Sequence, residues 1–136
     1  YFIIEALTFI VCLLIVTDYN SKNSIEASIK YFIISVLASS LALYGIVWVY
    51  GITKNTGFME FKVLFFAISS AEQGYVLTFL ELPVIFLLLS FLIKLGAFPF
   101  NIWVPDVYEG CPALILFYFM VSIKTVLIFT LIRLLF

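Results

Sequence analysis

Histidine is absent from the 136 residues of this chain, and cysteine occurs only twice, at Cys12 and Cys111. Zinc, haem and iron–sulfur centres take their protein ligands mainly from these two residue types, so the usual ligand sets cannot be assembled here. The two cysteines stand far apart with no CxxC spacing, and small apolar packing residues are their simplest interpretation. We therefore expect no metal centre in this chain.

Charged residues are also scarce. They make up 11% of the chain, while 65% of the residues are hydrophobic and the mean hydropathy is +1.26. An average soluble domain is about 25% charged, so a water-exposed surface cannot be built from this composition. The net charge of −1 leaves no basic face that would attract nucleic acid. These observations predict a membrane protein that binds lipid and no nucleic acid.

Apolar stretches of the chain approach the roughly 20 residues that a helix needs to cross a bilayer. They run over residues 1–19, 25–51, 77–95 and 113–136. The segment 52–75 is mixed, and its short apolar run 58–70 either lies along the interface or begins the next span. The sequence thus predicts an all-α transmembrane bundle with about four spans, organised as a single membrane domain over residues 1–136.

A discontinuous helix is predicted near residues 94–105. Lys94 ends a long apolar run, and Gly96, Pro99 and Pro105 follow it closely. Glycine and proline at this density cannot continue one unbroken helix. Transporters use such breaks to build ion sites where protein surrounds the unwound backbone, and the carbonyl end of a helix stabilises a nearby cation. The pattern therefore places Lys94 at a helix break.

Glu5, Lys94 and Lys124 lie inside apolar helices, where a charge facing lipid costs a few kcal/mol or more. Such residues usually face the protein interior, pair with one another or line a water path. Two interpretations stay open, a structural ion pair that locks helices together and a proton or ion path. Lys30 lies near a helix start, where its long stem can also reach the interface.

The stretch KLGAFPFNIWVPDVYEGCPA, residues 94–113, resembles the KxxxxPFHxWxPDxYxGAP signature of the antiporter-like membrane subunits of respiratory complex I. Its PDVYEG variant points to the subunit 2 type of NADH dehydrogenase within that family. Residues 24–51 resemble the EAxxKYF helix of this type. FIIEALTF resembles the glutamate helix before it, and VSIKTVLIF resembles the lysine helix after the signature. These segments stand in family order and cover essentially the whole chain.

The resemblance implies places on a proton path for Glu5, Lys30, Lys94 and Lys124. The family's glutamate pairs with the lysine at the discontinuous helix, so Glu5 is the expected partner of Lys94, the proton-carrying switch. Lys124 corresponds to the lysine that relays the proton towards the bundle centre, and Lys30 to a further lysine on the hydrophilic axis. Asn101 replaces the family's usual histidine, and its amide cannot titrate, which puts a protonic role there in doubt.

The resemblance also implies an assembly. We expect a membrane-arm subunit of proton-pumping NADH:ubiquinone oxidoreductase, with other membrane-arm subunits as partners. NADH, FMN, iron–sulfur clusters and ubiquinone are expected elsewhere in that enzyme, and no cofactor is expected in this chain. A skew towards Phe, Tyr, Ile, Leu, Asn and Lys, which have AT-rich codons, favours the mitochondrial inner membrane over the bacterial one.

The family's bundle carries a second repeat after the position of Lys124, whereas this chain holds about one. We therefore expect a truncated or partial form of such a subunit, and a separate chain that supplies the second repeat is a further expected partner. Two other functions stay open. One is a structural remnant that no longer pumps, and the other is a cation/proton antiporter subunit, which shares the ancestral fold.

Overall fold

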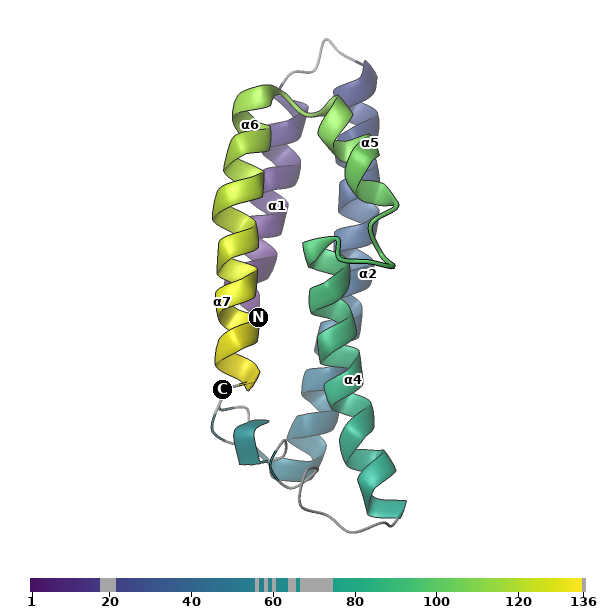
Figure 1. The fold of residues 1–136 in the computed structure, drawn as a ribbon, viewed down its shortest axis with the longest axis vertical. Coiled ribbons are helices and arrows are strands. Elements are labelled where there is room, and N and C mark those ends of the chain that lie inside the picture. Colours follow the sequence, from purple (N-terminus) through teal and green to yellow (C-terminus); the bar gives the residue numbers. More distant parts are fainter. Residues whose placement is uncertain are drawn as a thin grey trace.

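The computed structural model describes residues 1–17, 22–55, 57, 59, 61–63, 66 and 75–135, and these residues form helices and turns without any β-strand (Figure 1). The predicted all-α class is confirmed. The helices are α1 (Phe2–Val16), α2 (Lys22–Thr53), α4 (Tyr75–Leu95), α5 (Trp103–Gly110), α6 (Ala113–Tyr118), the π-helical turn η1 (Phe119–Ile123) and α7 (Lys124–Leu135). The expected apolar segment 58–70 lies largely outside the described residues.

Two helices in the described part of the chain are long and apolar enough to cross a membrane. They are α2 and the continuous helix Ala113–Leu135, with hydropathies of 2.2 and 2.3. α1 is apolar but shorter, with 15 residues. Large side chains point outward from the bundle, and Phe2 and Leu114 are 84% and 82% exposed. Lipid or a neighbouring subunit is the environment that suits such a surface.

α2 runs the length of the bundle, and two shorter helices, α4 and α5, follow one another along it (Figure 1). A Cβ added at Gly45 of α2 would lie 2.8 Å from Cγ of Leu87, and one added at Gly110 of α5 would lie 2.5 Å from the Asn23 carbonyl oxygen. Neither contact leaves room for a side chain. The two glycines therefore let α4 and α5 approach α2 closely, as small residues do between membrane helices.

The last helix closes the bundle. Its first part, α6, packs on α1, and its final part, α7, packs on α4. Its side chains join a core that lies where the helices meet beside the break. The buried members of this core are Val11, Ile15, Ala27, Tyr31, Trp103, Val107, Phe119, Ile123 and Leu127. Cys12 and Cys111 are free thiols that pack, partly buried, against this core, so their expected role as packing residues is confirmed.

The predicted break in the third apolar stretch is present. α4 ends at Leu95, and the amides of Gly96 and Ala97 donate to the carbonyl oxygens of Ile93 and Leu92. This pair of bonds is a Schellman cap, which needs a left-handed residue at the position of Gly96. Gly96 has φ +67, a conformation that glycine adopts without steric cost.

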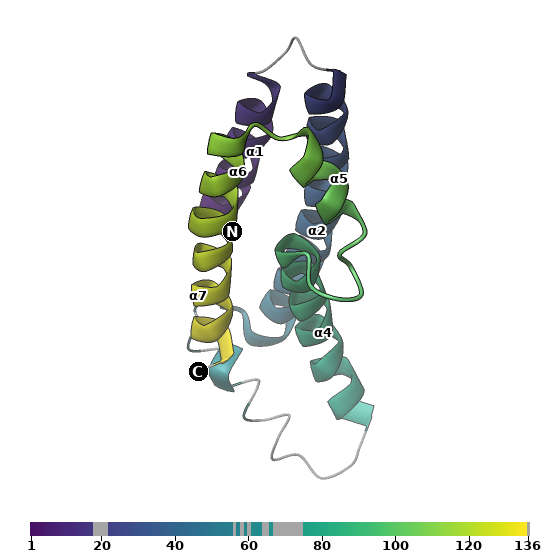
Figure 2. The ribbon, with the colours of Figure 1, turned by 45° about the horizontal axis from the view of Figure 1, so that its top comes forward.

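The chain beyond the cap leaves the line of α4 and returns as α5, as both views show (Figures 1 and 2). The sequence did not predict α5, because it counted Pro105 among the breaking residues. Pro105 instead lies inside the first turn of α5, where its missing amide has no helical partner to lose. Pro99 does lie in the non-helical segment. The expected role of Pro105 is thus corrected.

Candidate functional site

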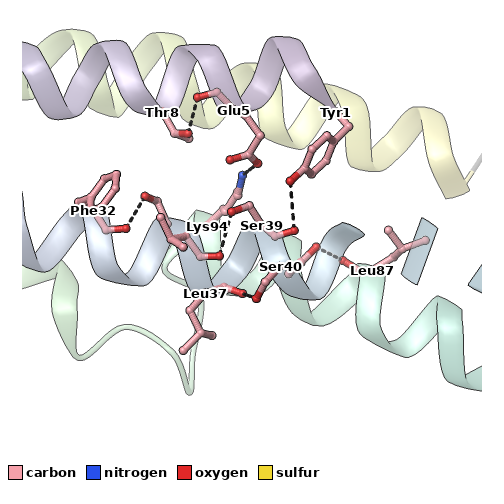
Figure 3. Close-up of polar contacts among 12 residues, drawn as sticks. Tyr1, Glu5, Thr8, Phe32, Leu37, Ser39, Ser40, Leu87 and Lys94 are labelled. Carbon is pink, nitrogen blue, oxygen red and sulfur yellow. Dashed lines mark hydrogen bonds and ion pairs between the residues drawn. The ribbon is translucent and has the colours of Figure 1, made fainter. Parts of the chain in front are cut away.

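An ion pair joins α1 to the broken end of α4. Nζ of Lys94 lies 2.5 Å from Oε1 of Glu5, although the two residues are 89 positions apart in sequence (Figure 3). The side chain of Lys94 is 6% exposed and that of Glu5 is 26% exposed. Lys94 lies in the last turn of α4, where the helix carbonyls also favour a cation. The pair thus has a counter-charge and a helix end to hold it inside the bundle.

Glu5 belongs to a polar stripe on α1. Tyr1, Glu5 and Thr8 are spaced by four and three residues, which places them on one face of a helix. The Thr8 hydroxyl donates to the Glu5 carbonyl oxygen at 2.8 Å, and the Tyr1 hydroxyl donates to the Ser39 carbonyl oxygen at 3.5 Å (Figure 3). The stripe therefore turns towards α2 and brings the Glu5 carboxylate into the bundle.

The buried serines on the facing side of α2 bond within their own helix. The hydroxyls of Ser35 and Ser39 donate to the carbonyl oxygens of Phe32 and Val36, at 2.8 and 2.9 Å. A hydroxyl that is satisfied in this way allows close packing between helices. These contacts agree with a packing role for the two serines.

A small cavity of about 10 Å³ lies beside Lys94. Its lining includes the polar side chains of Thr8, Ser35 and Lys94 and the rings of Tyr31 and Trp103. A cavity of this size is at the lower limit for one water molecule. Lys94 thus lines a space at the lower size limit for one water, and the rest of its lining is mainly apolar.

Lys124 lies where the last helix changes its hydrogen-bonding pattern. It follows η1 directly, and π-helical turns of this kind are frequent at functional sites. Its Nζ lies 5.4 Å from the centre of the Tyr108 ring, which is within the range of a cation–π contact. Lys124 is partly buried. Its charge is therefore held against an aromatic face rather than by a carboxylate in the described residues.

A cluster of four aromatic rings, here called the aromatic cluster, lies next to the surroundings of both lysines. The rings belong to Tyr31, Trp103, Tyr108 and Phe119. The Phe119 ring lies 5.3 Å from Tyr31, 6.5 Å from Trp103 and 6.0 Å from Tyr108, measured between ring centres. Tyr31 and Trp103 line the Lys94 cavity, and Tyr108 contacts Lys124. The cluster thus bridges the environments of Lys94 and Lys124.

Lys30 belongs to a separate, exposed group of charges. Its Nζ lies 2.7 Å from Glu26 within α2 and 2.8 Å from Asp106 on α5. The side chain of Lys30 is 40% exposed. Asp106 therefore ties α5 to α2 through Lys30, beside the close contact at Gly110.

The expectation of a buried charged path is corrected in part. None of Glu5, Lys30, Lys94 and Lys124 is buried as a whole residue. Among the side chains in the ion pairs described above, only that of Lys94 is largely enclosed, with 6% of its surface exposed. The structure brings Glu5 and Lys94 together, and it places Lys30 with exposed acids and Lys124 against an aromatic ring.

The sequence interpretation missed the part that α5 plays. Trp103 lines the Lys94 cavity, Asp106 pairs with Lys30, and Tyr108 contacts Lys124. All three stand in the signature stretch, so the motif itself was the available signal. It was overlooked because the stretch was expected to be a break, without a helix that presents side chains to the bundle.

A known protein family matches this chain over its full length. The family model described as NADH:quinone oxidoreductase/Mrp antiporter, TM, matches residues 1–136. The chain belongs to this NADH:quinone oxidoreductase/Mrp antiporter family.

Several curated relatives are similar to this member of the family. It is 39% identical over 111 residues to NADH-quinone oxidoreductase subunit N of Buchnera aphidicola subsp. Schizaphis graminum, which covers 82% of the chain and 22% of that protein. It is 40% identical over 121 residues to subunit N of Hirschia baltica, with 89% and 23% covered. It is 32% identical over 114 residues to NADH-ubiquinone oxidoreductase chain 2 of Marchantia polymorpha, with 84% and 23% covered. The chain thus spans less than a quarter of the length of these relatives.

Proposed function

We propose that the chain acts in the membrane arm of a proton-pumping NADH:quinone oxidoreductase, as a subunit 2 (subunit N) component that contributes part of a transmembrane proton path. The ion pair between Glu5 and Lys94 at the helix break carries this proposal. It combines an enclosed lysine, a counter-charge on another helix and a cavity of water size. Residues 1–136 are taken as a single membrane domain.

The mechanism follows from the strength of that pair. Two unit charges 4 Å apart attract by about 4 kcal/mol at an effective dielectric constant of 20. A shift of α1 that moves the Glu5 carboxylate away destabilises the charged form of Lys94 by an amount of this order. The proton of Lys94 then leaves towards the adjacent cavity, and Lys124 is the next basic group on the proposed path.

The driving reaction lies outside this chain in the proposal. Moving one charge across a membrane costs about 2.3 kcal/mol per 100 mV, so the path needs coupling to a reaction of that size. NADH, FMN, iron–sulfur clusters and ubiquinone are assigned to other subunits, and this chain supplies no redox centre. Other membrane-arm subunits, lipid and a chain with the second repeat are its proposed partners.

The mitochondrial inner membrane is the proposed location. The high content of residues with AT-rich codons supports it, with 16 Phe and 8 Tyr in the chain. An antiporter function is the second candidate, because the matching family model also names Mrp antiporters. The relatives described above are all named as oxidoreductase subunits, which favours the first function.

Proton translocation by the intact complex that carries Lys94→Met tests the proposal. We expect fewer protons moved per electron, because methionine keeps the length of the side chain but has no proton to give. Lys54→Met is the matched control, since Lys54 lies exposed just after α2, far along the chain from the ion pair. NADH oxidation and the amount of assembled complex are measured in parallel.

An unchanged proton yield with Lys94→Met would identify the pair as a structural lock, and the chain as a remnant that no longer pumps. If the single variant assembles poorly, Glu5→Gln is added to remove the carboxylate that it leaves unpaired. The double variant still lacks the transferable proton, so the same loss of proton yield is expected.

A further inference from the structure

Two polar atoms on α5 are enclosed by the bundle and have no hydrogen-bond partner in the described part of the chain. They are Nε1 of Trp103 and the hydroxyl oxygen of Tyr108. Buried polar side-chain atoms in folded proteins nearly always bond to protein or to ordered water, and buried waters typically serve groups of this kind. Ordered water is therefore the partner expected for each of the two atoms.

These two atoms lie on the side chains that adjoin the two lysines. Trp103 lines the cavity beside Lys94, and Nζ of Lys124 lies 5.4 Å from the centre of the Tyr108 ring. One unpartnered group thus belongs to the surroundings of each lysine.

Phe119 lies against both rings, at 6.5 Å from Trp103 and 6.0 Å from Tyr108 between ring centres. It is the first residue of η1, the π-helical turn that ends just before Lys124. A π-helical turn holds one residue more than an α-helical turn and interrupts the regular bonding. The ring that packs against both Trp103 and Tyr108 therefore belongs to a residue at an irregular point of the helix.

We propose that the Tyr108 hydroxyl and the Trp103 indole bind water between Lys94 and Lys124, and that this hydration site carries the proton from one lysine to the other. The inference rests on the proposed function and names the residues that connect its two lysines. The indole N–H is a donor only, so Trp103 is a positioning residue that orients the water. The Tyr108 hydroxyl both donates and accepts, so it can pass a proton on.

The proposed transfer moves one proton from Lys94 to Lys124 and leaves the groups between them unchanged. The ammonium of Lys94 gives a proton to bound water, which becomes neutral again by giving a proton to the Tyr108 oxygen. The hydroxyl proton that Tyr108 already holds passes to the neutral amine of Lys124, directly or through a second water. Lys94 ends as the neutral amine, Lys124 as the ammonium, and Tyr108 and the water are unchanged.

Tyr108→Phe tests this inference because it removes one oxygen and keeps the ring that packs on Phe119 and Lys124. We expect the protons moved per electron to fall by as much as in Lys124→Met. The thermal inactivation temperature of the complex should stay equal or rise, since the lost hydroxyl has no partner among the described residues. A purely structural tyrosine would not lose proton yield while keeping its stability.

Tyr118→Phe is the matched control, because Tyr118 lies on α6, close in sequence to Phe119, but is 40% exposed. It should leave both quantities unchanged. Trp103→Phe removes the other enclosed polar atom and keeps an aromatic ring. It should lower the proton yield in the same direction, and it serves as the second variant if Tyr108→Phe does not assemble.

A normal proton yield in Tyr108→Phe and Trp103→Phe, with a reduced yield in Lys94→Met and Lys124→Met, would overturn the inference and leave the proposed function standing. A drop in thermal stability of Tyr108→Phe at normal yield would also overturn it. A normal yield in Lys94→Met would overturn the proposed function and, with it, this inference.

Discussion

Glu5→Ala is expected to destabilise the bundle by about 3 kcal/mol, because it leaves the Lys94 ammonium enclosed without its counter-charge. The side chain of Lys94 is 6% exposed, so its ammonium has little contact with water that could replace the carboxylate. The measurement is the amount of assembled complex and its thermal inactivation temperature. Both should fall.

The double variant Glu5→Ala with Lys94→Met separates this cost from loss of packing. Removing both charges leaves no unpaired ion, and replacing a buried ion pair by apolar groups is often neutral for stability. Assembly should therefore return towards the wild-type level, while proton translocation should not. Glu81→Ala is the control, since Glu81 is an exposed acid on α4.

The pair would be shown to contribute little to stability if Glu5→Ala assembled as well as Glu81→Ala. Equal losses in the single and double variants would assign the effect to the shape of the Glu5 side chain. Only recovery in the double variant fits an ion pair whose members depend on each other.

Gly96→Ala is expected to destabilise the break by about 2 kcal/mol or more, for two reasons. The left-handed conformation at φ +67 costs about 1–2 kcal/mol for a residue with a Cβ. The added Cβ would also overlap Cγ2 of Val104, on the first turn of α5. The substitution therefore pushes α5 away from the end of α4 and should lower the thermal inactivation temperature of the complex.

Val104→Ala added to Gly96→Ala should restore part of the loss, because it removes the overlapping methyl group but not the backbone strain. Gly51→Ala is the matched control. A Cβ at Gly51 meets nothing within 4 Å, and alanine suits a helix better than glycine by about 0.5–1 kcal/mol. A harmless Gly96→Ala would show that the cap at the end of α4 tolerates a different backbone conformation.

The helical class and the break were predictable because they depend on composition and local chemistry. Long continuous apolar runs in a chain with 65% hydrophobic residues are typical of transmembrane helices, whose backbone groups bond within each segment. Gly96 ends α4 through a local cap whose bonds lie within a few residues. The pairing of Glu5 with Lys94 was expected from the family resemblance, and the structure brings the two side chains together.

The contacts of α5 were not predictable in this way. A proline in a sequence usually indicates the end of a helix. Pro105 is compatible with a helix only because it lies in the first turn of α5. The π-helical turn that begins at Phe119 has no glycine or proline to signal it. The placement of α5 brings Asp106 to Lys30, a contact between residues 76 positions apart that no local pattern indicates.

α5 carries Trp103, Asp106 and Tyr108, and these three side chains adjoin Lys94, Lys30 and Lys124 in turn. Because the three side chains share one helix of eight residues, a rotation or shift of α5 is expected to change all three contacts together. Substitutions at Asp106 and Tyr108 should consequently interact, and their combined effect should differ from the sum of the separate ones. A change at any one of the three lysine contacts should therefore alter the other two.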